Sequence, residues 1–328
     1  MQPKHAPVLV IGVSGLVGHA AAMRFRDAGY QVTGISRGPG EYPSVEALQE
    51  SLPGITIAQG DMGCRDVASE MCPAADLIVF AGGVSGVVES FDDPVASLTG
   101  NGIPWLQTLL CSQEGTSVLL VSSQLVYGPA TRKPFSEGDQ CSPRSPYALH
   151  RLLMEEQGRL YADRRNLAIL ALRLGNVYGK VVNLDAPRAH GLVAKMLKDL
   201  VRDGNIRLYG RGTQEVDLLH VDDLAAALVV VARTCSPGFG VYNISGERMT
   251  IRQVAEALRD GVERGELVDS PWPPAIRDAV ARDIVLDDRT FRDSFGWTPV
   301  RRGPQALTGI ASEWAPAVLG THKGTTYA

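Results

Sequence analysis

The fold of this chain is decided by the stretch Val8-Leu9-Val10-Ile11-Gly12-Val13-Ser14-Gly15-Leu16-Val17-Gly18. Its first four residues are an apolar run closed by glycine, which is typical of a strand buried on both faces. From Leu16 to Ala28 apolar residues recur at helical spacing, and Gly29 ends the pattern as a helix C-terminal glycine does. The sequence therefore predicts a strand, a tight glycine turn and a helix in direct succession.

The turn carries three glycines, Gly12, Gly15 and Gly18, spaced as GxxGxxG. Glycine lets the backbone approach a pyrophosphate closely, and the N-terminus of the next helix supplies N–H donors and partial positive charge. A glycine triplet alone is weak evidence, because such turns also occur for purely structural reasons. Here the flanking strand and helix supply the required context, so we expect a bound dinucleotide.

The end of the next predicted strand, Gln31–Ser36, indicates which dinucleotide binds. An NAD site places a carboxylate there, which accepts a hydrogen bond from the ribose 2′-hydroxyl. This chain has Ser36 followed by Arg37, and these two side chains would bind a 2′-phosphate that a carboxylate would repel. The residues favour NADP(H), with NAD as the alternative cofactor and a solvated surface position as the alternative for Arg37. Asp61, after the third strand, is placed to accept from the adenine amino group.

Further strands are expected with helix-length stretches between them, at Thr56–Ala58, Leu77–Ala81, Ser117–Ser122 and Ala168–Leu174. Strands that alternate with helices give a parallel sheet covered on both faces. We therefore expect an α/β fold with a doubly wound parallel (Rossmann) sheet, built by residues 1–178 and rejoined by residues 217–245. Beyond Gly179 the alternation weakens, so residues 179–216 and 246–320 are expected to form a smaller C-terminal substrate-binding lobe. Residues 321–328 are expected to be a flexible tail.

Ser123 and Tyr147 form a candidate proton-transfer pair, together with Arg151. Ser123 follows the strand at 117–122, and Tyr147 opens a predicted helix that reaches about Arg164. Tyr147 and Arg151 are four residues apart, so both face the same side of that helix. A phenol is a poor acid–base catalyst at neutral pH, and a fixed cation one turn away favours its ionised form. We interpret the group as catalytic residues for hydride transfer at a carbon that bears oxygen.

At this point the sequence resembles the extended short-chain dehydrogenase/reductase family, which contains sugar-nucleotide epimerases, dehydratases and reductases. The resemblance covers nearly the whole chain. Besides the glycine turn and Ser123 with Tyr147, it includes Phe80-Ala81-Gly82, Asn101, Leu172-Arg173-Leu174-Gly175-Asn176-Val177-Tyr178-Gly179, His220-Val221-Asp222-Asp223-Leu224-Ala225, Tyr242-Asn243-Ile244-Ser245-Gly246 and Phe295-Gly296-Trp297-Thr298-Pro299.

The resemblance implies a role for each matching residue. Ser123 orients the substrate, Tyr147 is the acid/base, Arg151 replaces the lysine that binds the nicotinamide ribose, and Asn176 lies near the substrate. The expected dinucleotide contacts are Gly12, Ser14, Gly15, Leu16, Val17, Gly18, Ser36, Arg37, Asp61, Met62, Ala81, Gly82, Tyr147, Arg151 and Leu174. The expected substrate contacts are Gly83, Ser85, Ser123, Gln124 and Asn176.

The chain departs from the family pattern at three places. Arg151 keeps the positive charge of the usual lysine but is planar and bulkier, so its hydrogen bonds must be rearranged. Gln124 and Leu125 stand where the 4,6-dehydratases of the family have an acid pair, so dehydration is not expected. Val216 stands where an arginine usually pairs with the diphosphate of a sugar nucleotide. The arginines weighed as substitutes are Arg188, Arg211, Arg277 and Arg282.

The bulk properties exclude several other classes of protein. A net charge of −4 over 328 residues gives no support to a nucleic-acid or anionic-membrane partner. The five cysteines are scattered, without CxxC or metal-ligand spacing, so we expect reduced thiols and no metal. The apolar run after Pro7 is too short for a signal peptide, and no segment approaches membrane-spanning length. A cytoplasmic protein is expected.

The function expected from these observations is NADPH-dependent reduction of a ketone, or the reverse oxidation, on a sugar nucleotide or a similar polar substrate. A sugar-nucleotide epimerase is the first alternative. The second is a regulatory dinucleotide-binding protein in which Arg151 marks lost catalysis. A homodimer is expected from the resemblance alone.

Overall fold

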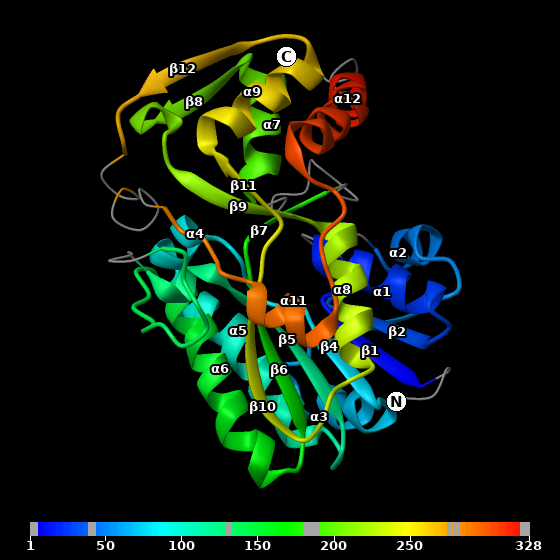
Figure 1. Ribbon diagram of the computed structural model, residues 1–328. Helices are drawn as coiled ribbons and strands as arrows, with labels where there is room; N and C mark the ends of the chain where they lie inside the picture. Colours follow the sequence, from blue (N-terminus) through cyan, green and yellow to red (C-terminus); the bar gives the residue numbers. More distant parts are fainter. Residues whose placement is uncertain are drawn as a thin grey trace.

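The computed structural model describes residues 6–38, 44–128, 133–179, 191–273, 277 and 283–321. A seven-stranded sheet, in the order β10-β6-β5-β4-β1-β2-β3, lies at its centre, and every neighbouring pair is parallel (Figure 1). The strands are β1 (Pro7–Ile11), β2 (Gln31–Ser36), β3 (Thr56–Gln59), β4 (Leu77–Phe80), β5 (Ser117–Ser123), β6 (Ala168–Leu174) and β10 (Gly238–Ile244). The doubly wound parallel sheet expected from the sequence is confirmed, and the expected strands end within one residue of the observed ones.

Helices cover both faces of this sheet, because successive buried side chains of β1 belong to two different core clusters. Val8 and Val10 belong to a core cluster shared with α1 (Leu16–Asp27), α2 (Val45–Ser51) and α8 (Val221–Ala232). Leu9 and Ile11 point to the other face, into a cluster shared with α3 (Arg65–Met71), α5 (Pro94–Cys111) and α6 (Pro146–Arg164). Each buried aliphatic side chain of this kind contributes about 1.5–3 kcal/mol, which explains the continuous apolar run in the sequence.

The direction of winding reverses between β1 and β4. β2 and β3 extend the sheet on one side of β1, whereas β4, β5, β6 and β10 extend it on the other. The loops that leave β1 and β4 therefore diverge at the carboxyl edge of the sheet. A crevice outside the carboxyl ends of the strands, at such a reversal, is where open α/β sheets bind ligands.

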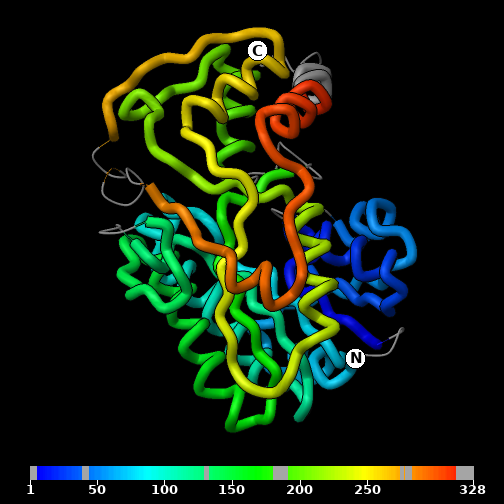
Figure 2. Tube along the Cα trace, viewed as in Figure 1, coloured from blue at the N-terminus to red at the C-terminus, as the bar shows by residue number. Residues whose placement is uncertain are grey.

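The remaining elements lie together beyond the carboxyl edge of the large sheet (Figures 1 and 2). A three-stranded sheet has the order β11-β9-β7, and β12 pairs with β8 in a two-stranded sheet. Their bounds are β7 (Asn176–Tyr178), β8 (Asn205–Tyr209), β9 (Glu215–His220), β11 (Glu247–Thr250) and β12 (Glu266–Ser270). α7 (Leu192–Asp203), α9 (Ile251–Val262) and α12 (Gly303–Thr321) share a third core cluster with them. Two more helices pack against elements of the large sheet layer. α4 (Val87–Asp92) packs against α5, and α11 (Arg289–Phe295) packs against β10.

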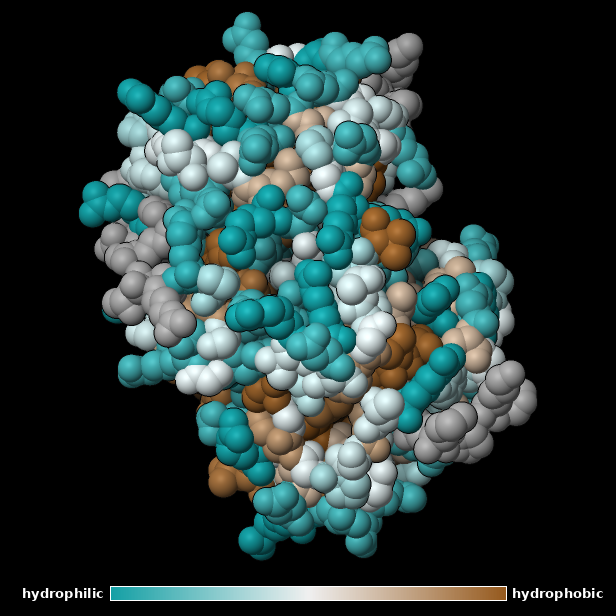
Figure 3. Space-filling view, in the orientation of Figure 1, coloured by the Kyte–Doolittle hydropathy of each residue, from teal (hydrophilic) through white to brown (hydrophobic). Residues whose placement is uncertain are grey.

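This grouping is compatible with a smaller C-terminal lobe, and we keep the predicted division at residues 179–216 and 246–320 as a proposal. The predicted tail at 321–328 lies outside the described residues, apart from Thr321. Figure 3 shows hydrophilic side chains over most of the visible face, with apolar residues in small patches between them. Among the described residues, no helix is both long and apolar enough to cross a bilayer.

Candidate active site

The three glycines of the turn between β1 and α1 serve different purposes. Gly12 has a φ of +86°, and a Cβ there would lie 2.6 Å from the Cα of Gly82, so the ends of β1 and β4 touch. A Cβ at Gly18 would lie 2.1 Å from the carbonyl oxygen of Gly12, so α1 packs directly on the turn. A Cβ at Gly15 would meet only that same oxygen, at 3.4 Å. Gly15 therefore leaves room beside the N-terminus of α1, where an anion is favoured.

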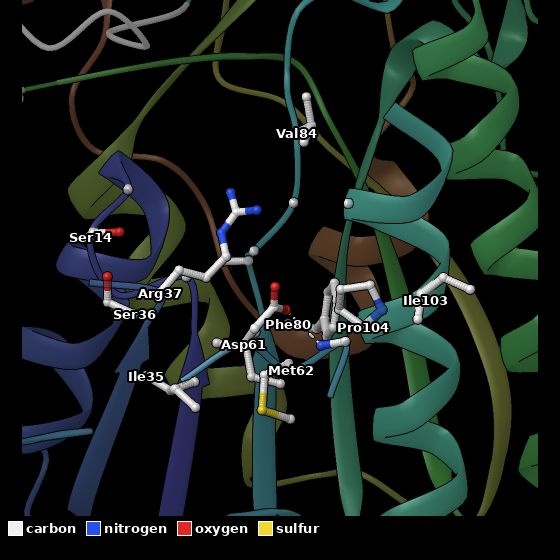
Figure 4. Close-up of a pocket in the computed structure, with 18 of the residues that line it drawn as sticks. Ser14, Ile35, Ser36, Arg37, Asp61, Met62, Phe80, Val84, Ile103 and Pro104 are labelled. Carbon is white, nitrogen blue, oxygen red and sulfur yellow. Dashed lines mark hydrogen bonds between the residues drawn. The ribbon is translucent and has the colours of Figure 1, made fainter. Parts of the chain in front are cut away.

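A cavity of about 470 Å³ opens at this turn, at the reversal between β1 and β4 (Figure 4). Its walls come from the ends of β1, β2 and β4, the segment after β3, and one side of α5. It brings together nine of the residues expected to contact a dinucleotide: Gly12, Ser14, Gly15, Ser36, Arg37, Asp61, Met62, Ala81 and Gly82.

Ser36 and Arg37 lie on one side of this cavity, opposite the side chains of Phe80 and Pro104 (Figure 4). Ser36 is only 4% exposed, and its hydroxyl has no hydrogen-bond partner among the described residues. Arg37 is exposed and lines the same wall. A buried polar atom without a partner is costly. A ligand oxygen at this position would satisfy it, so these residues fit a dinucleotide.

The wall formed by α5 was not identified from the sequence. Ala96, Thr99, Gly100 and Ile103 line the cavity, and their spacing puts them on one side of the helix. A Cβ at Gly100 would lie 2.5 Å from a methyl carbon of Val84, so the helix comes close to the loop after β4. Small residues at helical spacing are the signal that could have indicated this wall.

The candidate proton-transfer residues come from the end of β5 and the start of α6. Ser123 is the last residue of β5, and its hydroxyl accepts a hydrogen bond from the Leu125 amide at 3.2 Å. The hydroxyl of Ser145 caps α6 by accepting from the Ala148 amide at 3.2 Å, and Pro146 occupies the first turn, where its missing N–H costs nothing. This local sequence places Tyr147, which is half-buried, in the first turn of α6.

Arg151 joins three parts of the site. It is 5% exposed, and Nη1 donates to the carbonyl oxygen of Val121 at 3.1 Å. The guanidinium carbon lies 5.2 Å from the centre of the Tyr147 ring, within the range of a cation–π contact. A Cβ on Gly83, which lines the cavity, would lie 3.1 Å from Nη2. The cation is therefore in contact with the tyrosine and reaches the edge of the cavity.

The other expected contacts are more dispersed. Leu16, Val17 and Gly18 belong to α1 and do not line the cavity, and Leu174 is buried beside Ser123 in the sheet. Of the residues expected to contact the substrate, Gly83 lines the cavity and Ser85 is exposed just beyond it. Gln124 is buried in the turn after β5, and Oε1 has no partner among the described residues. The Asn176 amide donates to the Asp217 carbonyl oxygen at 3.2 Å.

Val216, at the expected arginine position, lies on β9 opposite Met249 and packs against the third core cluster. The side chain of the neighbouring Asp217 is 3% exposed, and Arg248 lies 3.9 Å from its carboxylate. Burial raises the pKa of Asp217 to about 7. Among the arginines weighed as substitutes, Arg211 and Arg277 are exposed, and Arg188 and Arg282 lie outside the described residues.

Comparison with known proteins gives one family and many relatives. The model of a family described as "NAD dependent epimerase/dehydratase family" matches residues 8–245. UDP-arabinose 4-epimerase 1 of Arabidopsis thaliana is 26% identical over 342 residues, which span 95% of this chain and 80% of that protein.

Solved structures with the same fold include a UDP-N-acetylglucosamine 4-epimerase from Methanobrevibacter ruminantium M1, in complex with UDP-N-acetylmuramic acid. It has a TM-score of 0.82 and 21% identity, and the match covers 97% of this chain and 100% of that one. A UDP-glucose 4-epimerase of Thermus thermophilus, in complex with NAD, has a TM-score of 0.81 and 20% identity, with 94% and 99% covered. At these identities the two likenesses bear on the fold alone.

Proposed function

This chain belongs to the NAD-dependent epimerase/dehydratase family, a family of enzymes, and on that basis we propose that it epimerises a sugar nucleotide at a carbon bearing a hydroxyl group. The observation that carries the proposal is the meeting of two groups at the carboxyl edge of the large sheet. Gly83 lines the cavity, and Arg151, in contact with Tyr147, lies against that residue. A substrate carbon held beside Gly83 would lie between a redox cofactor and a proton-transfer group.

The cofactor, when bound, supplies hydride transfer to and from the substrate carbon. The residues of the chain transfer the proton. Tyr147 accepts the hydroxyl proton as the carbon is oxidised and returns it when the ketone is reduced. Arg151 is a permanent cation that lies against the Tyr147 ring, where it can offset charge that develops during the proton transfer. Ser123, at the end of β5, holds the substrate oxygen by a hydrogen bond.

Epimerisation is preferred over the reductase function that the sequence alone favoured. A relative aligned over 95% of this chain is named as a UDP-sugar 4-epimerase, and the family is described by epimerases and dehydratases. Gln124 and Leu125 lack the carboxylates that dehydration requires. Of the two activities in the family description, epimerisation is therefore favoured. Ketone reduction remains the second candidate, because Ser36 and Arg37 favour NADP(H), the cofactor that reductases exchange with solution.

Turnover on a panel of UDP-, dTDP- and GDP-linked sugars tests the proposal. The expected result is a stereoisomer of one substrate, detected by NMR, without net change in the absorbance of reduced nicotinamide. If product forms in proportion to the cofactor that is oxidised, the protein is a reductase and the proposed epimerase function is wrong. Dinucleotide binding without turnover on any member of the panel would favour the regulatory alternative.

We also propose that the cavity prefers NADP(H) over NAD(H), although the Thermus relative was solved with NAD. The support is the partnerless Ser36 hydroxyl, among the described residues, and the cation of Arg37 on the same wall. Three further predictions remain proposals that rest on the arguments from sequence. They are the individual cofactor and substrate contacts, a cytoplasmic location and a homodimer.

Replacing Arg37 by alanine is expected to weaken NADPH binding by about 10- to 100-fold, since a charge-assisted hydrogen bond contributes about 1.5–3 kcal/mol. NADH affinity should hardly change, because NADH has no 2′-phosphate. Isothermal titration with both cofactors measures the difference. Arg24→Ala is the matched control, because Arg24 is an exposed arginine of α1 that does not line the cavity. Tighter binding of NADH than NADPH by the unaltered protein would refute the preference.

A further inference from the structure

A buried ion pair lies behind the candidate proton-transfer residues and belongs to none of the expected contacts. Glu155, on α6, is 0% exposed, and Arg173, on β6, is 4% exposed. The guanidinium forks onto the carboxylate, with Nε to Oε1 at 3.2 Å, Nε to Oε2 at 3.1 Å and Nη2 to Oε2 at 2.7 Å. The hydroxyl of Ser122, on β5, donates to the same carboxylate. One side chain of α6 thus binds two adjacent strands of the sheet.

The position of this pair along α6 matters. Glu155 follows Arg151 by four residues and Tyr147 by eight, so all three lie along one side of the helix. Ser122 immediately precedes Ser123 on β5. Across the β5–β6 pairing, Ser122 lies opposite Arg173. Arg151 itself donates to the carbonyl oxygen of Val121. Two consecutive turns of α6 are therefore attached to two consecutive residues at the end of β5.

The pair is also anchored from behind. The guanidinium carbon of Arg173 lies 4.7 Å from the centre of the Tyr127 ring, and the Tyr127 hydroxyl donates to Asn243 at 2.7 Å. Burial raises the pKa of Tyr127 to about 12, so this hydroxyl keeps its proton and stays a donor. Asn243 is the residue of β10 that pairs with Arg173. The network connects α6 to three neighbouring strands, so Glu155 has a fixed position in the sheet.

A buried ion pair is weak evidence for stability, because desolvation of both charges offsets their attraction. Apolar side chains of similar size would fill the same space at less cost in desolvation. The forked geometry has a different consequence: it permits only one position of α6 along β5. This is a matter of placement rather than of stability.

We propose that Glu155 and Arg173 are positioning residues, which fix the place of Tyr147 and Arg151 on α6 relative to Ser123 on β5. Neither lines the cavity, so they act through the helix and not on cofactor or substrate. The proposal rests on the proposed function in one respect, because its main readout is turnover. It predicts that breaking the pair impairs catalysis while dinucleotide binding is retained.

The first test is Glu155→Gln, which keeps the size of the side chain and its bond to Ser122 but removes the charge opposite Arg173. The expected result is a kcat lowered by up to about a hundredfold, because small misplacements of reacting groups have effects of that size. KM and the dinucleotide Kd should change little. The near-ultraviolet circular dichroism of Tyr147, taken as the difference from the Tyr147→Phe version, should also change, because the ring loses its fixed place beside Arg151. A variant that loses thermal stability but keeps kcat and this difference spectrum would overturn the proposal.

Glu156→Gln is the matched control. Glu156 is the next residue of the same helix, half exposed, and its carboxylate lies 3.5 Å from Arg159 on the surface. This variant should keep kcat, KM and the Tyr147 difference spectrum.

A double variant, Glu155→Met with Arg173→Met, separates placement from folding. It leaves no buried unpaired charge, so we expect it to fold with a Tm near that of the parent and still to show the lowered kcat. Full activity in this variant, or failure of both variants to fold, would show that the pair serves stability and would overturn the proposal.

An activity-independent readout distinguishes failure of this proposal from failure of the proposed function. The surroundings of the Tyr147 ring are followed by near-ultraviolet circular dichroism, as the difference between each protein and its Tyr147→Phe version. Glu155→Gln should change this difference spectrum even if the parent turns over none of the sugars, because the ring moves relative to Arg151. An unchanged difference spectrum would count against the positioning role, whatever the substrate.

Discussion

Replacing Tyr147 by phenylalanine is expected to lower kcat by about 10²- to 10⁴-fold, the usual contribution of general acid–base catalysis. Phenylalanine keeps the ring that lies 5.2 Å from the Arg151 guanidinium, so the contact between them and the start of α6 are preserved. Only the hydroxyl that exchanges the proton is lost. Steady-state kinetics with the substrate identified from the panel measures the effect, and isothermal titration checks that the dinucleotide still binds.

Tyr161→Phe is the control for this substitution. Tyr161 belongs to the same helix but packs against the core cluster that contains Leu9 and Ile11, and it does not line the cavity. Its loss of a hydroxyl should leave kcat unchanged. An unchanged kcat in Tyr147→Phe as well would mean that another group carries the proton, and the proposed role of Tyr147 would be wrong.

Replacing Gly18 by alanine is expected to abolish measurable dinucleotide binding and to destabilise the fold by about 1–3 kcal/mol, the usual cost of overpacking. The added Cβ would lie 2.1 Å from the carbonyl oxygen of Gly12 and 2.6 Å from its carbonyl carbon. These are backbone atoms of the turn itself, so the turn or the helix must move. Because Gly18 lies inside α1 and needs no positive φ, the effect isolates close packing from backbone strain.

Denaturant unfolding and cofactor titration measure these two effects. Gly309→Ala is the control: Gly309 is an exposed helical residue of α12, and a Cβ there meets nothing within 4 Å. Alanine at that position should be neutral or stabilise by about 0.5–1 kcal/mol. Normal NADPH affinity in Gly18→Ala would show that the turn tolerates a side chain and does not bind the pyrophosphate as closely as proposed.

Much of the large sheet follows from local patterns. The apolar run at Val8–Ile11 is continuous because both faces of β1 are buried, and the glycine turn has helical periodicity directly after it. The cavity was predictable in part for the same reason, since Gly12, Ser36 and Asp61 each end or follow a strand, and the carboxyl ends of parallel strands meet at one edge.

The elements of the three-stranded sheet were harder to predict. β7, β9 and β11 are short strands that pair with segments far away in the sequence, so their local patterns carry little information. The α5 wall and the Glu155–Arg173 pair were also missed. A glutamate in an otherwise ordinary helix is more often solvated than buried, and only the packing of α6 on β5 and β6 excludes water from Glu155.

The sequence by itself determined the parallel sheet and the glycine turn and supplied the candidates for proton transfer, because periodicity, glycine spacing and side-chain chemistry are local properties. Only the tertiary structure decided which of them meet. Arg151 lies against Tyr147 and Gly83, and Ser36 is left with a buried hydroxyl facing a cavity, because packing brings strand ends and helix faces from distant parts of the chain to one edge. Burial and contact depend on that packing, and no single segment encodes them.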